Sequence, residues 1–181
     1  MVLPGHIAGG YLITKALFSI APPSLSPEEI SILLFLGTIS GEIPDIDLIF
    51  SLSTKYFKSK FLKFDHREHI THAPIFWFTL CLFMLFVGYV SDSTFVVWAS
   101  VAIFLGTMSH FLLDSIEYGI RWLWPFTKRR YALIANPNAN RPREPVTVFY
   151  YLNYIKTEYI VRFSFYAEIA ITIIAIIVFL R

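Results

Sequence analysis

The sequence predicts an all-α fold: a polytopic membrane helical bundle of four to five helices, with a polar site at its cytoplasmic face. Of the 181 residues, 56% are hydrophobic, and the mean hydropathy of +0.60 is well above that of ordinary soluble proteins. Three apolar stretches are long enough to cross a bilayer, for which about 20 residues are needed. Histidines and aspartates fall near one end of the apolar stretches. These three observations together favour a membrane bundle with a site at one face.

The first two apolar stretches are short or interrupted. Residues 7–21 contain Lys15, and residues 30–50 are interrupted by Gly41-Glu42 and by Pro44-Asp45. Each stretch could be a short span or a re-entrant helix, which tolerates irregular backbone only inside protein or beside a wet cavity. If the two form a helical hairpin, the N-terminus lies on the same side of the membrane as the basic segments.

Three later stretches, residues 73–91, 95–113 and 159–180, are the expected full spans. A tight turn at residues 91–94 joins the first two. Residues 121–156 are polar, basic and rich in Pro and Asn, which prevents a continuous helix. We therefore expect a long loop or flap there, followed by a C-terminal membrane helix, within a single domain that comprises residues 1–181.

The basic residues predict the orientation of the bundle. Of 15 Lys and Arg residues, five lie in residues 55–67 and seven in residues 121–156, whereas the turn at 91–94 has none. The positive-inside rule places both basic segments in the cytoplasm and the turn outside. The expected location is therefore the cytoplasmic membrane, with several passes and the N-terminus inside. The single cysteine, Cys81, excludes an internal disulfide and a thiolate zinc site.

Ionisable side chains from distant parts of the chain are predicted at the same depth, on the cytoplasmic side. They lie at the start of the first helix, at the end of the second, just before the third and near the end of the fourth. The set is His6, Asp45, Asp47, His66, His69, His72, His110 and Asp114. The convergence of these side chains at one depth is the main indication of a functional site. A histidine near a helix end is more often a capping or interfacial residue than a ligand, and we interpret His69 as such a residue.

Two pairs in this set have spacings that suit a metal. His110 and Asp114 lie four residues apart and share a helix face, and imidazole with carboxylate suits zinc. An unpaired carboxylate in an apolar helix costs several kcal/mol and is usually functional, with an ion pair to Arg121 as the structural alternative. Asp45 and Asp47 follow a helix break. Both could point into one cavity, or one could bind a metal while the other orients a histidine.

Several short blocks give the chain a resemblance to a known family. They are Gly5-His6, Pro44-Asp45-Ile46-Asp47, His66-Arg67 with Thr71-His72, and Gly106 through Ser109-His110 to Asp114, followed by Gly119 and Trp124-Pro125-Phe126. In these blocks the sequence resembles the YdjM-like family of membrane-bound metal-dependent hydrolases. The order of ligands is also similar to the start of the pattern in zinc-dependent phospholipase C and P1 nuclease. Because no histidine follows His110, we expect one or two ions rather than three.

The working hypothesis is metal-assisted hydrolysis of a phosphoester. The expected ligands are His6, Asp45, His66, His72, His110 and Asp114. The expected cofactor is a divalent metal, zinc or alternatively manganese, which would lower the pKa of a bound water. Asp47 would orient a ligand or act as general base, and Arg67 would clamp phosphate oxygens.

The expected partners are membrane lipids and a phosphorylated lipid or similar small substrate. No nucleic acid is expected, and the sequence indicates no particular oligomer. Two other classes remain open. A transporter or ion- or proton-handling protein could use the same cluster, but its key groups should lie near the bilayer midplane. A binding protein with a structural metal should have a closed ligand shell.

Overall fold

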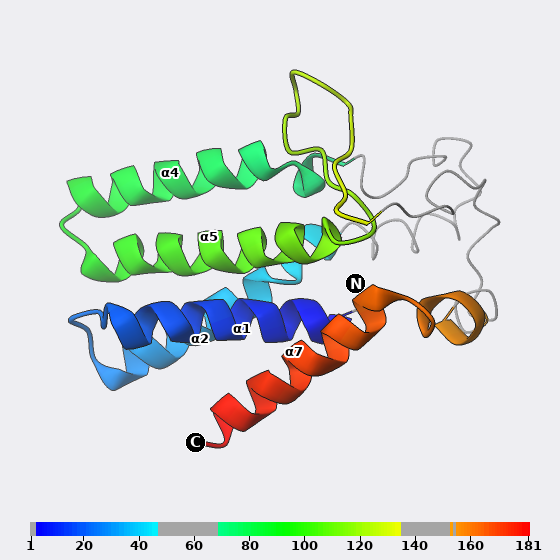
Figure 1. Ribbon diagram of the computed structural model, residues 1–181. Coiled ribbons are helices and arrows are strands. Elements are labelled where there is room, and N and C mark those ends of the chain that lie inside the picture. Colours follow the sequence, from blue (N-terminus) through cyan, green and yellow to red (C-terminus); the bar gives the residue numbers. More distant parts are fainter. Residues whose placement is uncertain (1–2, 47–68, 135–152, 154) are drawn as a thin grey trace, which may run out of the picture.

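The computed structural model describes residues 3–46, 69–134, 153 and 155–181. Within these residues the chain is helical and contains no strand. The α-helices are α1 (Leu3–Ile20), α2 (Pro27–Ser40), α4 (Pro74–Val90), α5 (Thr94–Asp114) and α7 (Phe163–Phe179). Helix α5 packs against α1, α2 and α4, while α7 packs on α1 and crosses it obliquely (Figure 1). The all-α prediction is confirmed for the described residues.

The predicted helical hairpin at the N-terminus is formed by α1 and α2. Ser26 begins α2 with a capping box: its hydroxyl accepts a hydrogen bond from the amide of Glu29, whose side chain accepts one from the Ser26 amide, so two otherwise unpaired amides are satisfied. Helix α2 ends at Ser40, and the predicted interruption becomes the 3₁₀ turn η1 (Ile43–Asp45). The break therefore places Asp45 just beyond the helix end.

Glycines bring α1, α2 and α5 unusually close together. A Cβ atom at Gly106 of α5 would lie 2.3 Å from the carbonyl oxygen of Gly37 in α2. One at Gly41, just after α2, would lie 2.3 Å from the carbonyl oxygen of His6 in α1. Small residues at such crossings allow helix backbones to touch, as is common among membrane helices. This contact fixes the end of α2 beside the start of α1.

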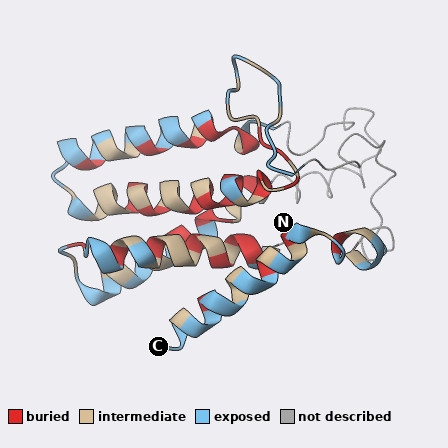
Figure 2. Cartoon of the chain, in the orientation of Figure 1, coloured by how far each residue is buried: buried red, intermediate tan, exposed pale blue. Residues whose placement is uncertain are grey.

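The predicted hairpin of residues 73–113 is formed by α4 and α5. The hydroxyl of Ser93 caps α5 by accepting from the Val96 amide. Midway along the pair, the hydroxyl of Ser100 donates to the carbonyl oxygen of Cys81 at 2.6 Å. Near the start of α4, the Trp77 ring packs with Phe111 of α5 in a buried apolar cluster. Buried residues lie between the helices and exposed ones on their outer sides (Figure 2).

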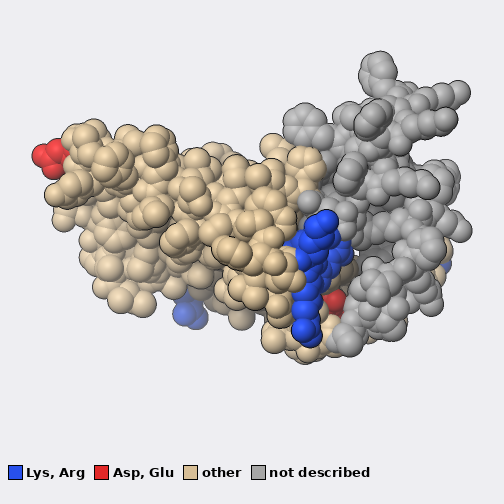
Figure 3. All heavy atoms as spheres, turned by 90° about the horizontal axis from the view of Figure 1, so that it is seen from above, with Lys and Arg blue, Asp and Glu red and all other residues tan. Residues whose placement is uncertain are grey.

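The outer faces of the helices are apolar. Phe83 and Phe86 of α4 are more than 60% exposed, as is Phe179 of α7, and exposed apolar surface of this extent marks contact with a partner or a membrane. The described part of the face seen in Figure 3 carries few charges: a group of basic side chains toward one end, a smaller basic group on the lower edge and an acidic group at the opposite end. One described helix, α5 with 21 residues, is both long and apolar enough to cross a membrane; α4 and α7 are apolar but have 17 residues each.

The segment after α5 is irregular, as predicted. Residues 115–134 form turns, and the backbones of Ile120 and Tyr131 exchange two hydrogen bonds of 3.1 and 2.9 Å, so the intervening residues form a closed loop. The chain returns to helix in the π-helical turn η4 (Ile155–Tyr159), shortly before α7. Residues 135–152, the central part of the predicted flap, lie outside the described residues.

The close helix contact at Gly106 predicts a specific intolerance to substitution. Gly106→Ala should lower the free energy of unfolding by about 1–3 kcal/mol, because the added methyl group meets backbone that cannot move aside. Gly9→Ala is the matched control, since its methyl group would first meet a flexible side-chain end, Leu113 Cδ1 at 2.9 Å. Thermal unfolding of the two purified variants in the same detergent compares them. Equal stability of the two variants would contradict the close-packing account.

Candidate metal centre

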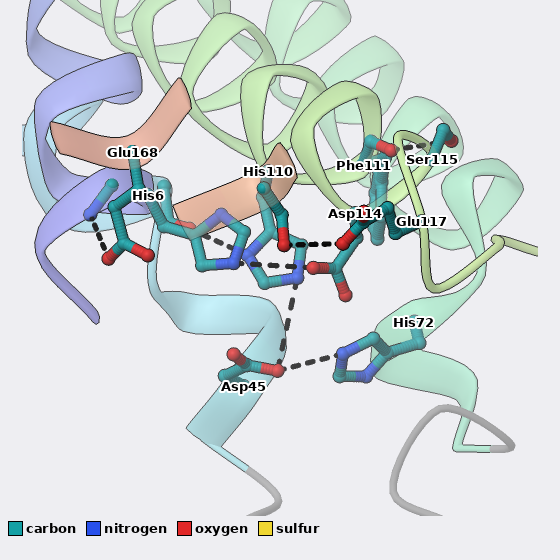
Figure 4. A network of polar contacts seen from close by, with 12 residues as sticks. His6, Asp45, His72, His110, Phe111, Asp114, Ser115, Glu117 and Glu168 are labelled. Carbon is teal, nitrogen blue, oxygen red and sulfur yellow. Dashed lines mark hydrogen bonds and ion pairs between the residues drawn. The ribbon is translucent and has the colours of Figure 1, made fainter. Parts of the chain in front are cut away.

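Four separate elements bring five ionisable side chains together at one end of the bundle (Figure 4). One comes from the first turn of α1, one from η1, one from the 3₁₀ turn η3 (Ile70–His72) and two from the end of α5. They are His6, Asp45, His72, His110 and Asp114. All five belong to the set of ligands predicted from sequence.

These side chains are almost completely removed from solvent. His6 and His110 have no exposed surface, and His72 and Asp114 have 1%. The side chain of Asp45 is 12% exposed. Burial of two carboxylates costs several kcal/mol each unless opposite charge compensates it. A buried cluster of this composition therefore needs either protonated histidines or a bound cation.

The donor atoms form two overlapping triplets that share His110. His6, Asp45 and His110 form one, and His72, His110 and Asp114 the other; within each, the atoms lie within 4.8 Å of one another. His6 Nε2 is 3.5 Å from Asp114 Oδ1, and His110 Nε2 is 3.9 Å from Asp45 Oδ1. Two ligands of a tetrahedral zinc ion lie about 3.3 Å apart for bond lengths near 2.05 Å. A small contraction around an ion would bring these pairs to that spacing.

A backbone contact fixes the orientation of the His110 ring. Its Nδ1 lies 2.8 Å from the carbonyl oxygen of Gly41, and because a carbonyl only accepts, Nδ1 must carry the proton. The lone pair of neutral His110 is therefore on Nε2, which faces the cluster. A hydrogen bond of this kind from the second ring nitrogen is usual in metal-binding histidines. The ring also stacks on His6, with centroids 4.0 Å apart.

Several ring nitrogens in the cluster lack hydrogen-bond partners. Among the described residues, His6 Nδ1, His6 Nε2 and His110 Nε2 are buried without one, whereas buried polar atoms are normally satisfied. This set of unsatisfied imidazole nitrogens beside carboxylates fits a divalent cation such as zinc, whose usual ligands are these groups. The residues present therefore match the predicted cofactor in type and position.

Asp45 is held ionised by its neighbours. Burial raises the pKa of its carboxyl group, but the hydrogen bond with His72 Nε2 at 2.9 Å and the nearby His110 lower it more. The net pKa lies well below the usual range for aspartate. A carboxylate hydrogen-bonded to a histidine in this way can either bind a metal directly or orient the ring that does.

Glu42 is a neighbour of the cluster that the sequence analysis did not include. Burial, and secondarily the charge of Asp45, raises the pKa of its carboxyl group to about 8. Its Oε2 is buried without a hydrogen-bond partner. The sequence signal that could have identified Glu42 is its position at the predicted helix break. A carboxylate there, beside Pro44-Asp45, is close in sequence to the expected ligands.

Two acidic residues toward the C-terminus, Glu158 and Glu168, have different surroundings. Glu168 of α7 is buried and accepts a hydrogen bond of 3.0 Å from the amide of Gly5, and a second one from the Tyr159 hydroxyl. It thereby ties α7 to the residue preceding His6. Glu158 instead pairs with Arg162 at 3.5 Å, near the surface. Neither glutamate belongs to the two triplets.

The remaining predicted site residues are not all testable in the structure. Asp47, His66 and Arg67 lie outside the described residues. His69 is exposed and belongs to neither triplet, in line with the interpretation given to it from sequence. Trp122, which follows Asp114 along the chain, donates from its ring N–H to the Ser115 hydroxyl at 2.8 Å and packs against Phe111, which is next to His110.

Comparisons with known proteins identify relatives of the chain. Residues 1–180 match the family model described as YdjM inner membrane protein. The chain is similar to the inner membrane protein YbcI of Escherichia coli (strain K12), with 32% identity over 102 residues, which is 55% of this chain. The matched region spans 57% of the length of that relative. No solved structure matches the chain.

The cluster predicts metal binding that depends on its buried carboxylates. Asp114→Asn keeps the shape of the side chain but removes its charge, and it should lower metal affinity at least about tenfold. Asp92→Asn, in the exposed turn between α4 and α5, is the matched control because asparagine tolerates its positive φ of 50°. Elemental mass spectrometry of the purified proteins after dialysis measures the bound metal. Unchanged metal content in Asp114→Asn would rule this carboxylate out as a ligand.

Proposed function

The chain belongs to the YdjM inner membrane protein family, and from that premise and the buried His/Asp cluster we propose that it is a membrane-bound metal-dependent hydrolase. Its substrate is a phosphoester of a lipid or of another membrane-associated molecule. The observation that carries the proposal is the pair of overlapping His/Asp triplets centred on His110. The similarity to zinc-dependent phospholipase C and P1 nuclease remains a prediction from the order of the ligands.

The number of ligands favours chemistry over a structural metal. Each triplet offers three protein ligands, and catalytic zinc sites typically have three, with the fourth position left for water or substrate. Asp45 and His72, which are hydrogen-bonded to each other, belong to different triplets. An ion held by either triplet therefore has a position left open. Because Nδ1 of His110 is engaged, only Nε2 can bind metal, which favours one ion at this residue.

In the proposed hydrolysis, the residues of the cluster would have different roles. Either His6, Asp45 and His110 or His72, His110 and Asp114 would hold the ion, with the Gly41 carbonyl fixing the His110 ring. A divalent cation at such a site lowers the pKa of water toward neutrality and offsets negative charge on phosphate oxygens. The hydrogen bond between His72 and Asp45 would orient whichever of the two side chains is not a ligand. That side chain could accept a proton from the attacking water.

Glu42 is placed to handle a proton at the same site. Burial raises the pKa of its carboxyl group, so that a proton held there could be donated to a leaving oxygen. We keep Asp47 as the proposed general base or orienting residue and Arg67 as the proposed phosphate clamp, both from the sequence.

The position of the cluster favours a hydrolase over a transporter. His6 lies in the first turn of α1, Asp114 is the last residue of α5, and Asp45 lies beyond the end of α2. Transporters place their key groups near the middle of broken helices, whereas this cluster lies at the ends of unbroken ones. The buried acidic residue of α7, Glu168, also lies near a helix end, in the second turn of α7, and contacts Gly5. A transporter or ion-handling role remains the alternative proposal.

The surroundings favour an anionic, membrane-associated substrate. We propose that the bundle crosses the membrane several times with the cluster facing the cytoplasm, as the positive-inside rule indicates. Lys128 and Arg129 are exposed in the loop that follows α5, and basic groups beside a membrane attract anionic headgroups. A phosphorylated lipid could thus reach the site from the bilayer surface.

A matched pair of histidine variants tests the hydrolase. His72→Gln should lower the rate of phosphate or phosphoalcohol release from lipid phosphoesters in vesicles at least about tenfold. His69→Gln, three residues away and exposed, should retain the wild-type rate. The rate is measured with zinc and then with manganese, and chelation followed by return of the metal should abolish and restore it.

The same vesicles distinguish the alternative. Protein in vesicles loaded with a zinc-sensitive or pH-sensitive dye should show no ion flux above that of empty vesicles. Metal-loaded protein that hydrolyses none of a panel of phosphomonoester and phosphodiester lipids, yet transports ions in a His72-dependent manner, would overturn the hydrolase in favour of the transporter.

A further inference from the structure

An apolar groove lies on the side of α1 that faces α2 and α7. Its volume is about 710 Å³, and its walls are mainly apolar side chains such as Leu34, Phe35, Ile176 and Phe179. The groove follows the helix axes: Pro4 and Thr38 line the end near the metal centre, and Lys15 and Ser31 line it farther along. Its long direction is therefore the direction in which lipid chains lie beside a membrane helix.

The groove is separate from the metal centre. Pro4, Ala8, Tyr11 and Lys15 line it from α1, and their spacing places them on one helix face. His6 lies on a different face of α1, where its ring stacks on His110 of α5. Helix α1 therefore separates an occupant of the groove from the His/Asp cluster.

Lys15 is the one charged side chain among the described residues that line the groove. It is partly buried, and no described acidic side chain lies within ion-pair distance of it. Glu28 and Glu29 begin the neighbouring helix α2, but Glu29 is engaged in the capping box. An ammonium group at the edge of an apolar groove is stabilised by a nearby anion, which favours an anionic occupant.

The polar groups of the groove separate into satisfied and unsatisfied ones. The hydroxyls of Ser31 and Thr38 donate to the carbonyl oxygens of Pro27 and Leu34 in their own helix. The Thr172 hydroxyl, on the α7 wall, is buried and has no hydrogen-bond partner among the described residues.

We propose that this groove binds an anionic phospholipid, with an acyl chain along the apolar walls and the phosphate group at Lys15. Lys15 lies five residues before the end of α1, about 8 Å along the axis, so its long side chain can extend toward the headgroup layer. The lipid would belong to the leaflet on the opposite side of the membrane from the metal centre.

A second copy of the chain is a poorer occupant. Helix α4 has no acidic residue, and the acidic residues of α5 and α7 are Asp114 and Glu168, which are both buried. The outward faces of these helices therefore offer no anion to Lys15. A phospholipid supplies both the chain and the negative charge.

Native mass spectrometry of the full chain in detergent tests the proposal with two defined lipids, phosphatidylglycerol and phosphatidylcholine. The wild type should prefer phosphatidylglycerol about fivefold, the contribution expected from one lysine near anionic lipid. Lys15→Gln should lose that preference, while Lys128→Gln, in the exposed loop after α5, should keep it. Ser31→Trp, at an exposed position of the lining, should reduce binding of both lipids by obstructing the groove.

The controls make each outcome decisive. Lys15→Gln should keep the metal content of the wild type, which shows that it is folded and that the groove is independent of the proposed hydrolase. Equal lipid preference in wild type and Lys15→Gln would overturn the proposal. A dimer that Ser31→Trp dissociates would also overturn it, by assigning the groove to a second copy.

Discussion

The hydrogen bond between His110 Nδ1 and the Gly41 carbonyl is the contact on which the arrangement of the site depends. At 2.8 Å it joins the end of α5 to the connection after α2, and it sets the tautomer that directs Nε2 into the cluster. It requires the backbone to approach closely, which the absence of a side chain at Gly41 allows. The same residue touches the backbone of His6, so one glycine positions two histidines from helices distant in sequence.

Burial explains why this cluster differs from an ordinary surface group of histidines. Two carboxylates and three imidazoles with almost no exposed surface are unfavourable without compensating charge, which the proposed cation would supply. The rest of the fold keeps the cluster closed. Glu168 and its contact with Gly5 hold α7 against the start of α1, and Trp77 packs with Phe111, whose ring contacts that of His110. The apolar outer faces place these polar groups at one end of a bundle whose natural solvent is lipid.

Hydrophobic runs and basic segments were sufficient to predict the helices, the two hairpins and the convergence of His6, Asp45, His72, His110 and Asp114. Runs of apolar residues mark helices reliably because lipid or core burial requires them, and helix order then sets which ends meet. The raised pKa of Glu42, the role of the Gly41 carbonyl and the groove at Lys15 could not be predicted in this way. Each depends on how closely particular backbones approach, which sequence spacing does not encode.

X-ray absorption spectroscopy at the metal edge of purified, metal-loaded protein tests the central claim most directly, because it reports the donor atoms themselves. The account predicts a shell of nitrogen and oxygen only, at about 2.0–2.2 Å, with the outer scattering that imidazole rings produce. A sulfur ligand at about 2.3 Å would contradict it, since the cysteine of this chain, Cys81, lies in α4 and belongs to neither triplet. A shell without imidazole scattering would contradict it equally.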